Sequence, residues 1–341
     1  MASSSKVGFI LLVWFATSTI FNDVTPRLMK ILMGSGGDNM DVTVIELAIT
    51  LAIAASKLRF EGSRVIPPNS LLSGLFCVGG FHLAGCRAFI WGLQFIPVAI
   101  AQTIRAANPV VTVAFGTLFF GEALPRFSIF SCLLPLVVGF AVAVSGGASD
   151  VAPVGVVAAI FSVSCLTIVN RQSKKILSGA KEAVLPGEIQ CWICAAALFL
   201  LFPFWAFSGG PARLATAFTG PNSSTISLLC CADGALYFSE QLAQFAAITL
   251  LSPLTLAVVD TTRRVFIVVV AGFVLQGDAV TPQRVVGALI VYAGAALYAY
   301  MSCSQAEFTS LWVSKSASSE ISSPRSSARL ATPTPAKLKA A

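Results

Sequence analysis

Four arginines lie within stretches of the sequence that are otherwise almost entirely apolar. They are Arg87, Arg105 and the adjacent pair Arg263 and Arg264. An arginine at the centre of a membrane-spanning helix costs about 2.5–3.5 kcal/mol on insertion scales. Guanidinium groups form paired hydrogen bonds with phosphate and carboxylate oxygens and keep their charge in almost any environment. We therefore expect these side chains to face a polar cavity and to hold an anionic substrate there.

An acidic residue close to the pair allows a structural explanation for part of this charge. Asp260 precedes Arg263 and Arg264 by three and four residues. A helix would place all three on one face, where Asp260 could neutralise one arginine. Under this alternative the neutralised arginine would stabilise the packing of helices rather than bind substrate.

Glu240 and His82 complete the set of candidate substrate-binding residues. Glu240 could instead form an ion pair with Arg87, and Asp233 is a further acid in the same apolar region. For His82, the alternative is a hydrogen bond within the packed helices. Four arginines against Asp233, Glu240 and Asp260 leave an excess of positive charge, which favours an anion as the substrate.

The sequence lacks the signatures of an enzyme. It contains neither HExxH nor GxSxG nor a P-loop lysine, and it has 1 histidine. Cys191 and Cys194 have CxxC spacing, but they lie in an apolar stretch without a second pair of ligands, which favours a packing role. We expect no enzymatic activity, no cofactor and no metal site.

The elements that position these residues are predicted to be transmembrane helices. Of the 341 residues, 56% are hydrophobic and 11% are charged, against roughly 25% charged residues in an ordinary soluble domain. Apolar stretches of about 20 residues, each long enough to cross a bilayer as a helix, recur along the chain. We predict an all-α membrane protein with ten transmembrane helices. They are expected at residues 7–32, 42–58, 71–95, 98–120, 127–145, 151–169, 184–207, 224–250, 253–275 and 284–301.

The two halves of the sequence repeat each other at an offset of 156 residues. The offset pairs Pro97 with Pro253, Gly116 with Gly272, Gly121 with Gly277, Glu122 with Asp278 and Ala123 with Ala279. Each half has an odd number of predicted spans, so the second repeat would be inverted, as in many transporters. The predicted five-helix repeats are residues 1–148 and 149–303. Because Arg105 corresponds to Thr261 at this offset, basic groups from both halves are expected to meet in one central cavity.

The distribution of charge across the loops predicts the orientation. With a cytoplasmic N-terminus, most lysines and arginines of the loops, and all those of the C-terminal tail, lie on the cytoplasmic side. Both termini are therefore expected in the cytoplasm, and the net charge of +7 does not indicate a nucleic-acid partner. Residues 304–341 are rich in Ser, Ala, Pro and Lys, which predicts a disordered cytoplasmic tail.

Two features bear on the compartment. The first apolar segment is too long for a cleaved signal peptide, and no transit peptide is recognisable before it. Lys337 and Lys339 resemble a dilysine retrieval signal, with the alternative that two lysines of a basic tail fall there by chance. We expect a multi-pass protein of the endoplasmic reticulum or Golgi membrane.

Two runs carry a family resemblance: Asp260-Thr261-Thr262-Arg263-Arg264, and Thr103-Ile104-Arg105-Ala106 followed by Asn108-Pro109. They resemble the triose-phosphate translocators, which belong with the nucleotide-sugar transporters to the drug/metabolite transporter superfamily. The resemblance covers nearly all of the chain before the tail. It implies a ten-helix fold of two inverted repeats.

The resemblance also implies roles for individual residues. Arg105 stands where the family has a phosphate-binding lysine, and Arg263 and Arg264 stand at its Lys-Arg pair. Cys86 and Phe89 fall on positions where the family has histidine and threonine. Glu240 falls on that of a tyrosine, and an acid there would repel a free phosphate unless Arg87, which also differs from the family, neutralises it.

These observations lead to one expected function and one alternative. The expected function is exchange of phosphate-bearing organic anions, either sugar phosphates or nucleotide sugars, by alternating access. The partners are then the lipid bilayer, the anionic substrate and, as an open alternative, a second copy of the chain in a homodimer. The rival hypothesis is a membrane adaptor that transports nothing and whose buried ion pairs hold helices together.

Overall fold

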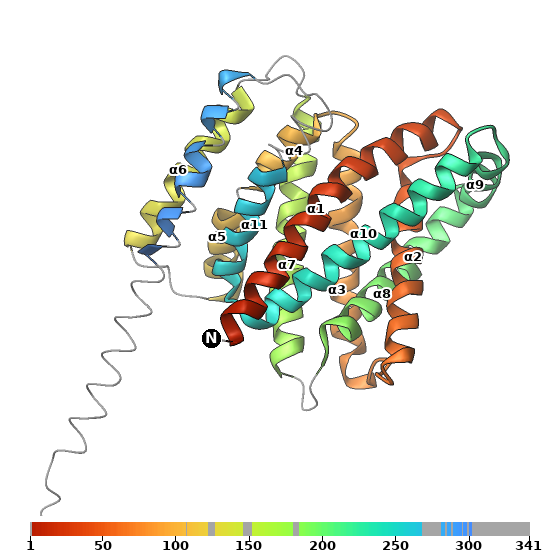
Figure 1. Cartoon of the computed structure of the whole chain (residues 1–341), viewed down its shortest axis with the longest axis horizontal. Helices are drawn as coiled ribbons and strands as arrows, with labels where there is room; N and C mark the ends of the chain where they lie inside the picture. Colours follow the sequence, from red (N-terminus) through yellow and green to blue (C-terminus); the bar gives the residue numbers. More distant parts are fainter. Residues whose placement is uncertain are drawn as a thin grey trace, which may run out of the picture. The chain divides into compact units, whose positions relative to one another are not determined.

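Helices account for all the regular secondary structure of the described residues (Figure 1). The computed structural model describes residues 2–106, 108–121, 127–145, 152–179 and 184–267, together with 281–301 apart from four single positions. Over this range the predicted all-α fold is confirmed. The predicted tail at 304–341 and the predicted boundary between repeats at 148/149 lie outside the described residues.

Most helices lie at or near the predicted spans. The first half contains α1 (Ala2–Gly34), α2 (Asn39–Phe60), the 3-10 helix η1 (Asn69–Leu71), α3 (Leu72–Gly92), α4 (Val98–Arg105), α5 (Asn108–Phe120) and α6 (Phe127–Ser145). The second half contains α7 (Pro153–Gly179), α8 (Pro186–Phe207), α9 (Gly210–Thr219), α10 (Ser223–Leu250) and α11 (Pro253–Ile267). Further helical residues follow within 282–301.

Local sequence signals explain where some of these helices begin and end. The Asp38 side chain caps the N-terminus of α2, and the Asp41 carboxylate accepts a hydrogen bond from the Asp38 backbone N–H over 2.7 Å. Just after α2, Gly62 has a φ of 67°, a left-handed conformation that favours glycine. Pro186 opens α8, where the missing N–H leaves no helical hydrogen bond unmade.

The outer surface of the helices suits a lipid environment. Four described helices are long and apolar enough to cross a membrane: Lys6–Gly34, Asn69–Gly92, Pro153–Gly179 and Pro186–Phe207. Large apolar side chains project outward from them and stay exposed, among them Phe9, Leu12, Val157, Phe199 and Phe204. A soluble monomer rarely exposes so much apolar surface, which marks this surface as one that contacts lipid.

Helices far apart in the sequence pack side by side. The main pairs are α3 with α7, α1 with α10 and α2 with α8. Small residues allow the close approach: a Cβ added at Gly79 of α3 would lie 2.7 Å from the Cβ of Ala196 in α8. A Cβ added at Gly85 of α3 would lie 3.1 Å from that of Cys165 in α7. Membrane helices commonly associate through such small residues, because van der Waals contact replaces the hydrophobic effect between them.

The fourth predicted span is not one continuous helix, which corrects the prediction for 98–120. It is divided into α4, which ends at Arg105, and α5, which begins at Asn108. Pro109 explains the break, because it has no N–H to donate and its ring conflicts with the carbonyl four residues earlier. Beside the break, the carbonyl of Ala106 accepts a hydrogen bond of 2.9 Å from the Thr261 hydroxyl of α11.

Two further elements differ from the predicted spans, and a third is described only in part. α7 continues to Gly179 instead of ending at residue 169, so that Lys174 lies on a helix and its Nζ donates to the Ile248 carbonyl near the end of α10 over 3.1 Å. The short helix α9 lies between two predicted spans and was not predicted. α11 is described as far as Ile267, and the rest of the predicted ninth span lies outside the described residues.

Candidate substrate site

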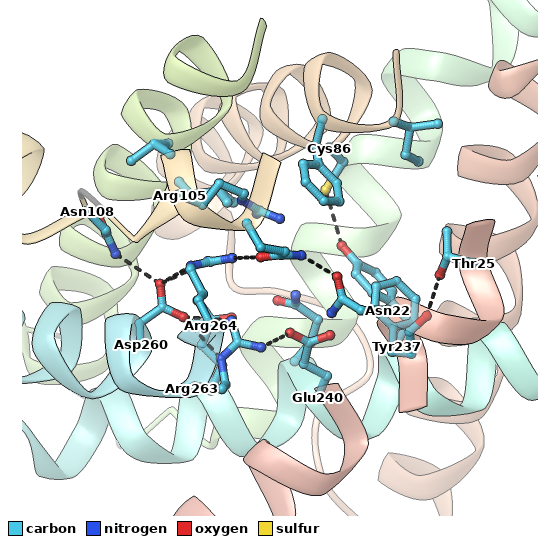
Figure 2. A pocket seen from close by; sticks show the side chains of 18 of the residues that line it. Asn22, Thr25, Cys86, Arg105, Asn108, Tyr237, Glu240, Asp260, Arg263 and Arg264 are labelled. Atoms are coloured by element: carbon cyan, nitrogen blue, oxygen red, sulfur yellow. Dashed lines mark hydrogen bonds and ion pairs between the residues drawn. The ribbon is translucent and has the colours of Figure 1, made fainter. Parts of the chain in front are cut away.

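A polar cavity lies between α1, α2, α3, α4, α5, α7, α10 and α11 (Figure 2). Its volume is about 60 Å³, and its lining combines charged and amide side chains with a few aromatic rings. The polar lining residues are Asn22, Thr25, Glu46, Gln102, Arg105, Asn108, Asn170, Tyr237, Glu240, Gln241, Gln244, Asp260, Arg263 and Arg264. A polar cavity inside an apolar bundle is the usual position of a solute-binding site in a membrane carrier.

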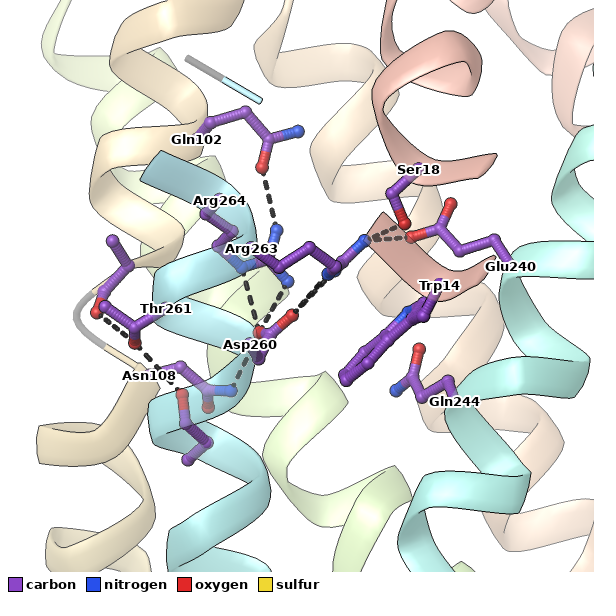
Figure 3. Close-up of polar contacts among 12 residues, drawn as sticks. Trp14, Ser18, Gln102, Asn108, Glu240, Gln244, Asp260, Thr261, Arg263 and Arg264 are labelled. Carbon is purple, nitrogen blue, oxygen red and sulfur yellow. Dashed lines mark hydrogen bonds and ion pairs between the residues drawn. The ribbon is translucent and has the colours of Figure 1, made fainter. Parts of the chain in front are cut away.

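Arg263 is held by two acids and an aromatic ring (Figure 3). Its Nη2 lies 2.6 Å from Oδ1 of Asp260 on the same helix, and its Nη1 forms an ion pair with Glu240 of α10. Its guanidinium carbon lies 4.6 Å from the centroid of a Trp14 ring, and Nη1 also donates to the Ser18 hydroxyl. Arg263 thereby connects α11 to α1 and α10.

Arg264 shares the same acid but points to another part of the cavity. Its Nε donates to Oδ2 of Asp260 over 2.9 Å, and its Nη1 donates to the Gln102 side-chain carbonyl of α4 over 2.8 Å. The Gln102 side-chain amide in turn donates to Oδ1 of Asn22 on α1. A continuous chain of hydrogen bonds therefore runs from α11 across α4 to α1 (Figures 2 and 3).

Arg105 is the cation of this site that no acid neutralises. Its guanidinium carbon lies 4.1 Å from the centroid of the Phe89 ring on α3, a cation–π contact. Within the described part of the chain no salt bridge to Arg105 is formed, and its buried Nε has no hydrogen-bond partner. Three arginines against Asp260 and Glu240 leave the charged cluster with one net positive charge, 3 − 2 = +1, when all five are ionised.

The break between α4 and α5 places Asn108 at the junction of three helices. Its Nδ2 donates to Oδ2 of Asp260 over 3.1 Å, and its Oδ1 accepts from the hydroxyls of Thr167 over 3.0 Å and Thr112 over 3.3 Å. Asp260 therefore receives hydrogen bonds from Asn108, Arg263 and Arg264. Such an over-determined carboxylate holds the arginine pair in a fixed orientation at the cavity wall.

The structure brings together four of the six predicted site residues: Arg105, Arg263, Arg264 and Glu240 all line the cavity. Arg87 does not line it and donates instead from Nη2 to the side-chain carbonyl of Asn39 over 3.1 Å. The ion pair suggested between Glu240 and Arg87 is therefore wrong, because Glu240 pairs with Arg263. The predicted neutralisation by Asp260 is confirmed, and it involves both members of the arginine pair.

His82 lies behind the cavity wall and not on it. Its Nε2 and the Tyr237 hydroxyl are 2.8 Å apart, and the same hydroxyl lies 3.3 Å from Sγ of Cys86. Tyr237 and Cys86 line the cavity, whereas His82 is only 2% exposed and is not among the lining residues. The histidine thus takes the hydrogen-bonded position between packed helices that was the alternative to substrate binding.

Several lining residues were not predicted as site residues from the sequence. The uncharged ones are mostly amides, namely Asn22, Gln102, Asn108, Asn170, Gln241 and Gln244. A buried amide in a membrane helix is costly unless it finds a partner, so these positions carried a usable signal. Cys86 and Phe89, which align with site positions of the resembled family, do lie on the cavity wall.

Comparison with known proteins agrees with this arrangement. Residues 5–299 match the Triose-phosphate Transporter family, which includes almost all of the described chain. The chain belongs to this family. The family match and the apolar helices together make it a multi-pass membrane protein.

Relatives from this family match at low identity over most of the chain. The chloroplastic triose phosphate/phosphate translocator of Flaveria trinervia is 25% identical over 300 residues, 85% of this chain and 70% of the relative. The chloroplastic glucose-6-phosphate/phosphate translocator 2 of Arabidopsis thaliana is 24% identical over 310 residues, 87% of this chain and 75% of the relative. A protein of Schizosaccharomyces pombe that is named as a transporter is 24% identical, and this chain spans 60% of its length.

The fold is shared with a solved structure. It is a crystal structure whose sequence is 16% identical, and the two superpose with a TM-score of 0.58. The superposition covers 86% of this chain and 98% of the other. At this identity the match supports the arrangement of the helices and carries no information on substrate.

Proposed function

We propose that the protein is a carrier that exchanges sugar phosphates for phosphate across a membrane. Two relatives whose names specify substrates are translocators of triose phosphate and glucose 6-phosphate against phosphate. A third match, of Arabidopsis thaliana, is named for xylulose 5-phosphate and phosphate. The common chemistry of these substrates is a phosphate group on a small polar body, which suits a cavity walled by arginines, amides and few apolar side chains.

The observation that carries this proposal is the unpaired guanidinium of Arg105 at the cavity wall. Opposite it, Arg264 contributes a second cation, which Asp260 partly neutralises. A phosphate entering between these two helices would receive charge-assisted hydrogen bonds from α4 and α11 at once. Arg263, held by Glu240 and Asp260, acts as the support that fixes this wall.

Exchange follows from the same charge. A buried cation with no counter-ion is costly in a site closed to water, and a bound anion removes that cost. The carrier therefore closes around its substrate more readily than it closes empty. A carrier that reorients only when loaded exchanges one anion for another instead of transporting it in one direction.

Alternating access requires two halves that move against each other, and we assign them to inverted repeats with residues 1–148 and 149–303. Helix packing supports this assignment: α1 packs on α10 as α3 packs on α7, and α2 packs on α8. The first three spans of the proposed first repeat are α1, α2 and α3, and those of the second are α7, α8 and α10. Interchanging the repeats therefore converts the α1–α10 pair into the α7–α3 pair and leaves the α2–α8 pair unchanged. The discontinuous helix α4–α5 at the cavity is a further common feature of carriers of this kind.

Counter-exchange in proteoliposomes tests the proposal. Purified protein is reconstituted into vesicles loaded with radiolabelled phosphate, and release of label is followed after external addition of triose phosphate, glucose 6-phosphate, xylulose 5-phosphate or a nucleotide sugar. We expect release with at least one sugar phosphate and none without an external anion. Equal release with and without external anion would refute exchange. No release with any compound would favour the membrane adaptor.

A further inference from the structure

A second polar group lies at the edge of the cavity, away from the arginines. The carboxyl groups of Glu46 on α2 and Asp233 on α10 lie within interaction distance of each other. Both side chains are fully enclosed, with 2% and 0% of their surface exposed. The Thr25 hydroxyl of α1 donates to Oδ1 of Asp233 over 2.6 Å, and Glu46 is itself a lining residue of the cavity.

Close packing of α2 and α10 forces the two acids together. A Cβ added at Gly234, the residue after Asp233, would lie 2.5 Å from the Cβ of Ile49 on α2. The Thr50 hydroxyl also donates to the Gly234 carbonyl over 3.2 Å. The absence of a side chain at Gly234 thus lets the helices cross at the level of the acid pair.

The pair must hold at least one proton. Two ionised carboxylates this close together repel strongly in a medium of low polarity, and a proton on one of them replaces the repulsion with a hydrogen bond. No basic side chain in the described part of the chain forms an ion pair with either acid. Oε1 of Glu46 and Oδ2 of Asp233 are buried, and no donor in the described part of the chain reaches either oxygen, so a proton held between the two acids would satisfy both.

The surroundings of the pair connect it to the substrate cavity. The titratable groups near it are Cys230, Tyr237 and Glu240 on α10 and Cys86 on α3. Asp233, Tyr237 and Glu240 are spaced by four and three residues, so they occupy one face of α10. Glu240 at the end of this row is the partner of Arg263. The row therefore leads from the acid pair to the arginine cluster.

We propose that Glu46 and Asp233 form a proton-binding site that gains a second proton when a phosphate-bearing anion enters the cavity. The proposal rests on the proposed transport function for its substrate. A phosphate monoester carries about −1.5 to −2 charge near neutral pH, which the single net positive charge of the arginine cluster does not balance. Transfer of one proton from solvent to the singly protonated pair removes its remaining negative charge, so that anion and proton are occluded together.

The first test asks whether the pair holds a proton in the absence of substrate. Infrared absorption of the purified protein at neutral pH is compared between wild type, the double variant Glu46→Gln/Asp233→Asn and the control Glu61→Gln, whose carboxylate is exposed and paired with Lys57. We expect the band of a protonated carboxyl group in wild type and in the control, and its loss in the double variant. An unchanged band in the double variant would overturn the proposal.

The second test measures coupling to substrate. Calorimetric titration with inorganic phosphate in buffers of different ionisation enthalpy gives the number of protons taken up per phosphate bound. Protonation of phosphate itself contributes equally in every variant and therefore cancels in the comparison. Per phosphate bound, Glu46→Gln should take up fewer protons than wild type, by up to about one, and Glu61→Gln should take up the same number as wild type.

An equal proton number in wild type and Glu46→Gln would overturn the coupling. Absence of phosphate binding by wild type would refute the proposed function, and with it the coupling to a phosphate-bearing substrate. In that case the infrared band still decides whether Glu46 and Asp233 share a proton. The two failures are therefore distinguishable.

Discussion

The guanidinium carbon of Arg105 lies 4.1 Å from the centroid of the Phe89 ring, and the two residues come from α4 and α3. The ring supports the cation on one side, and in the described part of the chain Arg105 forms no salt bridge and its Nε has no hydrogen-bond partner. Arg263 and Arg264, in contrast, are both tied to Asp260. Arg105 is therefore the cation proposed to bind the anion, whereas Arg263 and Arg264 are already paired with Asp260.

Asp260 is expected to be essential for stability. Asp260→Asn preserves the shape of the side chain but leaves Arg263 and Arg264 without their common counter-ion. Removing one partner of a buried ion pair typically costs about 3–5 kcal/mol, so the melting temperature of the detergent-purified variant should fall strongly. Arg105→Ala should not lower it comparably, since no acid loses a partner. A larger loss of thermal stability in Arg105→Ala than in Asp260→Asn would contradict the assigned roles.

Chemical modification of Cys86 tests whether the cavity is reached from solvent. Its thiol lines the wall beside Tyr237, whereas Cys77 lies nine residues earlier on α3 and does not line it. A small anionic methanethiosulfonate reagent should block exchange in wild type, and added sugar phosphate should protect against the block. Cys86→Ser should resist the reagent, and Cys77→Ser should stay as sensitive as wild type. Inhibition of Cys86→Ser at the wild-type rate would show that Cys86 is not reached from the cavity.

Thr261 is expected to hold the broken helix to α11. Its hydroxyl lies 2.9 Å from the carbonyl of Ala106 and 3.0 Å from that of Ala257 in its own helix, whereas the Thr262 hydroxyl donates to the Val258 carbonyl of that helix. Thr261→Val should cost about 1–3 kcal/mol, because it leaves a buried carbonyl unsatisfied. Thr262→Val is the matched control and should cost less. Thermal unfolding of the two purified variants measures the difference, and equal losses would argue against a special role for the break.

The positions of the main site arginines could be predicted from the sequence, because charge in an apolar span is a strong signal. The break after Arg105 was also encoded, by Pro109, but the apolar character of residues 98–120 continues across it and suggested one helix. Which helix faces meet could not be predicted, since it depends on packing between distant segments. For that reason the sequence suggested Arg87 as the partner of Glu240, although Asn39 lies beside Arg87 and Arg263 beside Glu240.

The acid pair illustrates the same limit. Asp233 was noticed as an acid in an apolar region, but Glu46 precedes it by 187 residues and nothing local relates the two. Only the close crossing of α2 and α10 at Gly234 brings the carboxyl groups into contact. A pair of this kind becomes recognisable when the structure supplies the distance between helices.

Exchange by the Arg105→Ala variant tests the central claim most directly. Wild-type proteoliposomes loaded with radiolabelled phosphate should release it against external sugar phosphate. The variant, at equal amount in the membrane, should retain a tenth of that rate or less, since a lost charge-assisted hydrogen bond costs about 1.5–3 kcal/mol. Arg105→Lys should keep part of the activity, and Arg27→Ala, which removes an exposed arginine paired with Asp23, should behave as wild type. Exchange by Arg105→Ala at the wild-type rate would contradict the assignment of this arginine to the substrate.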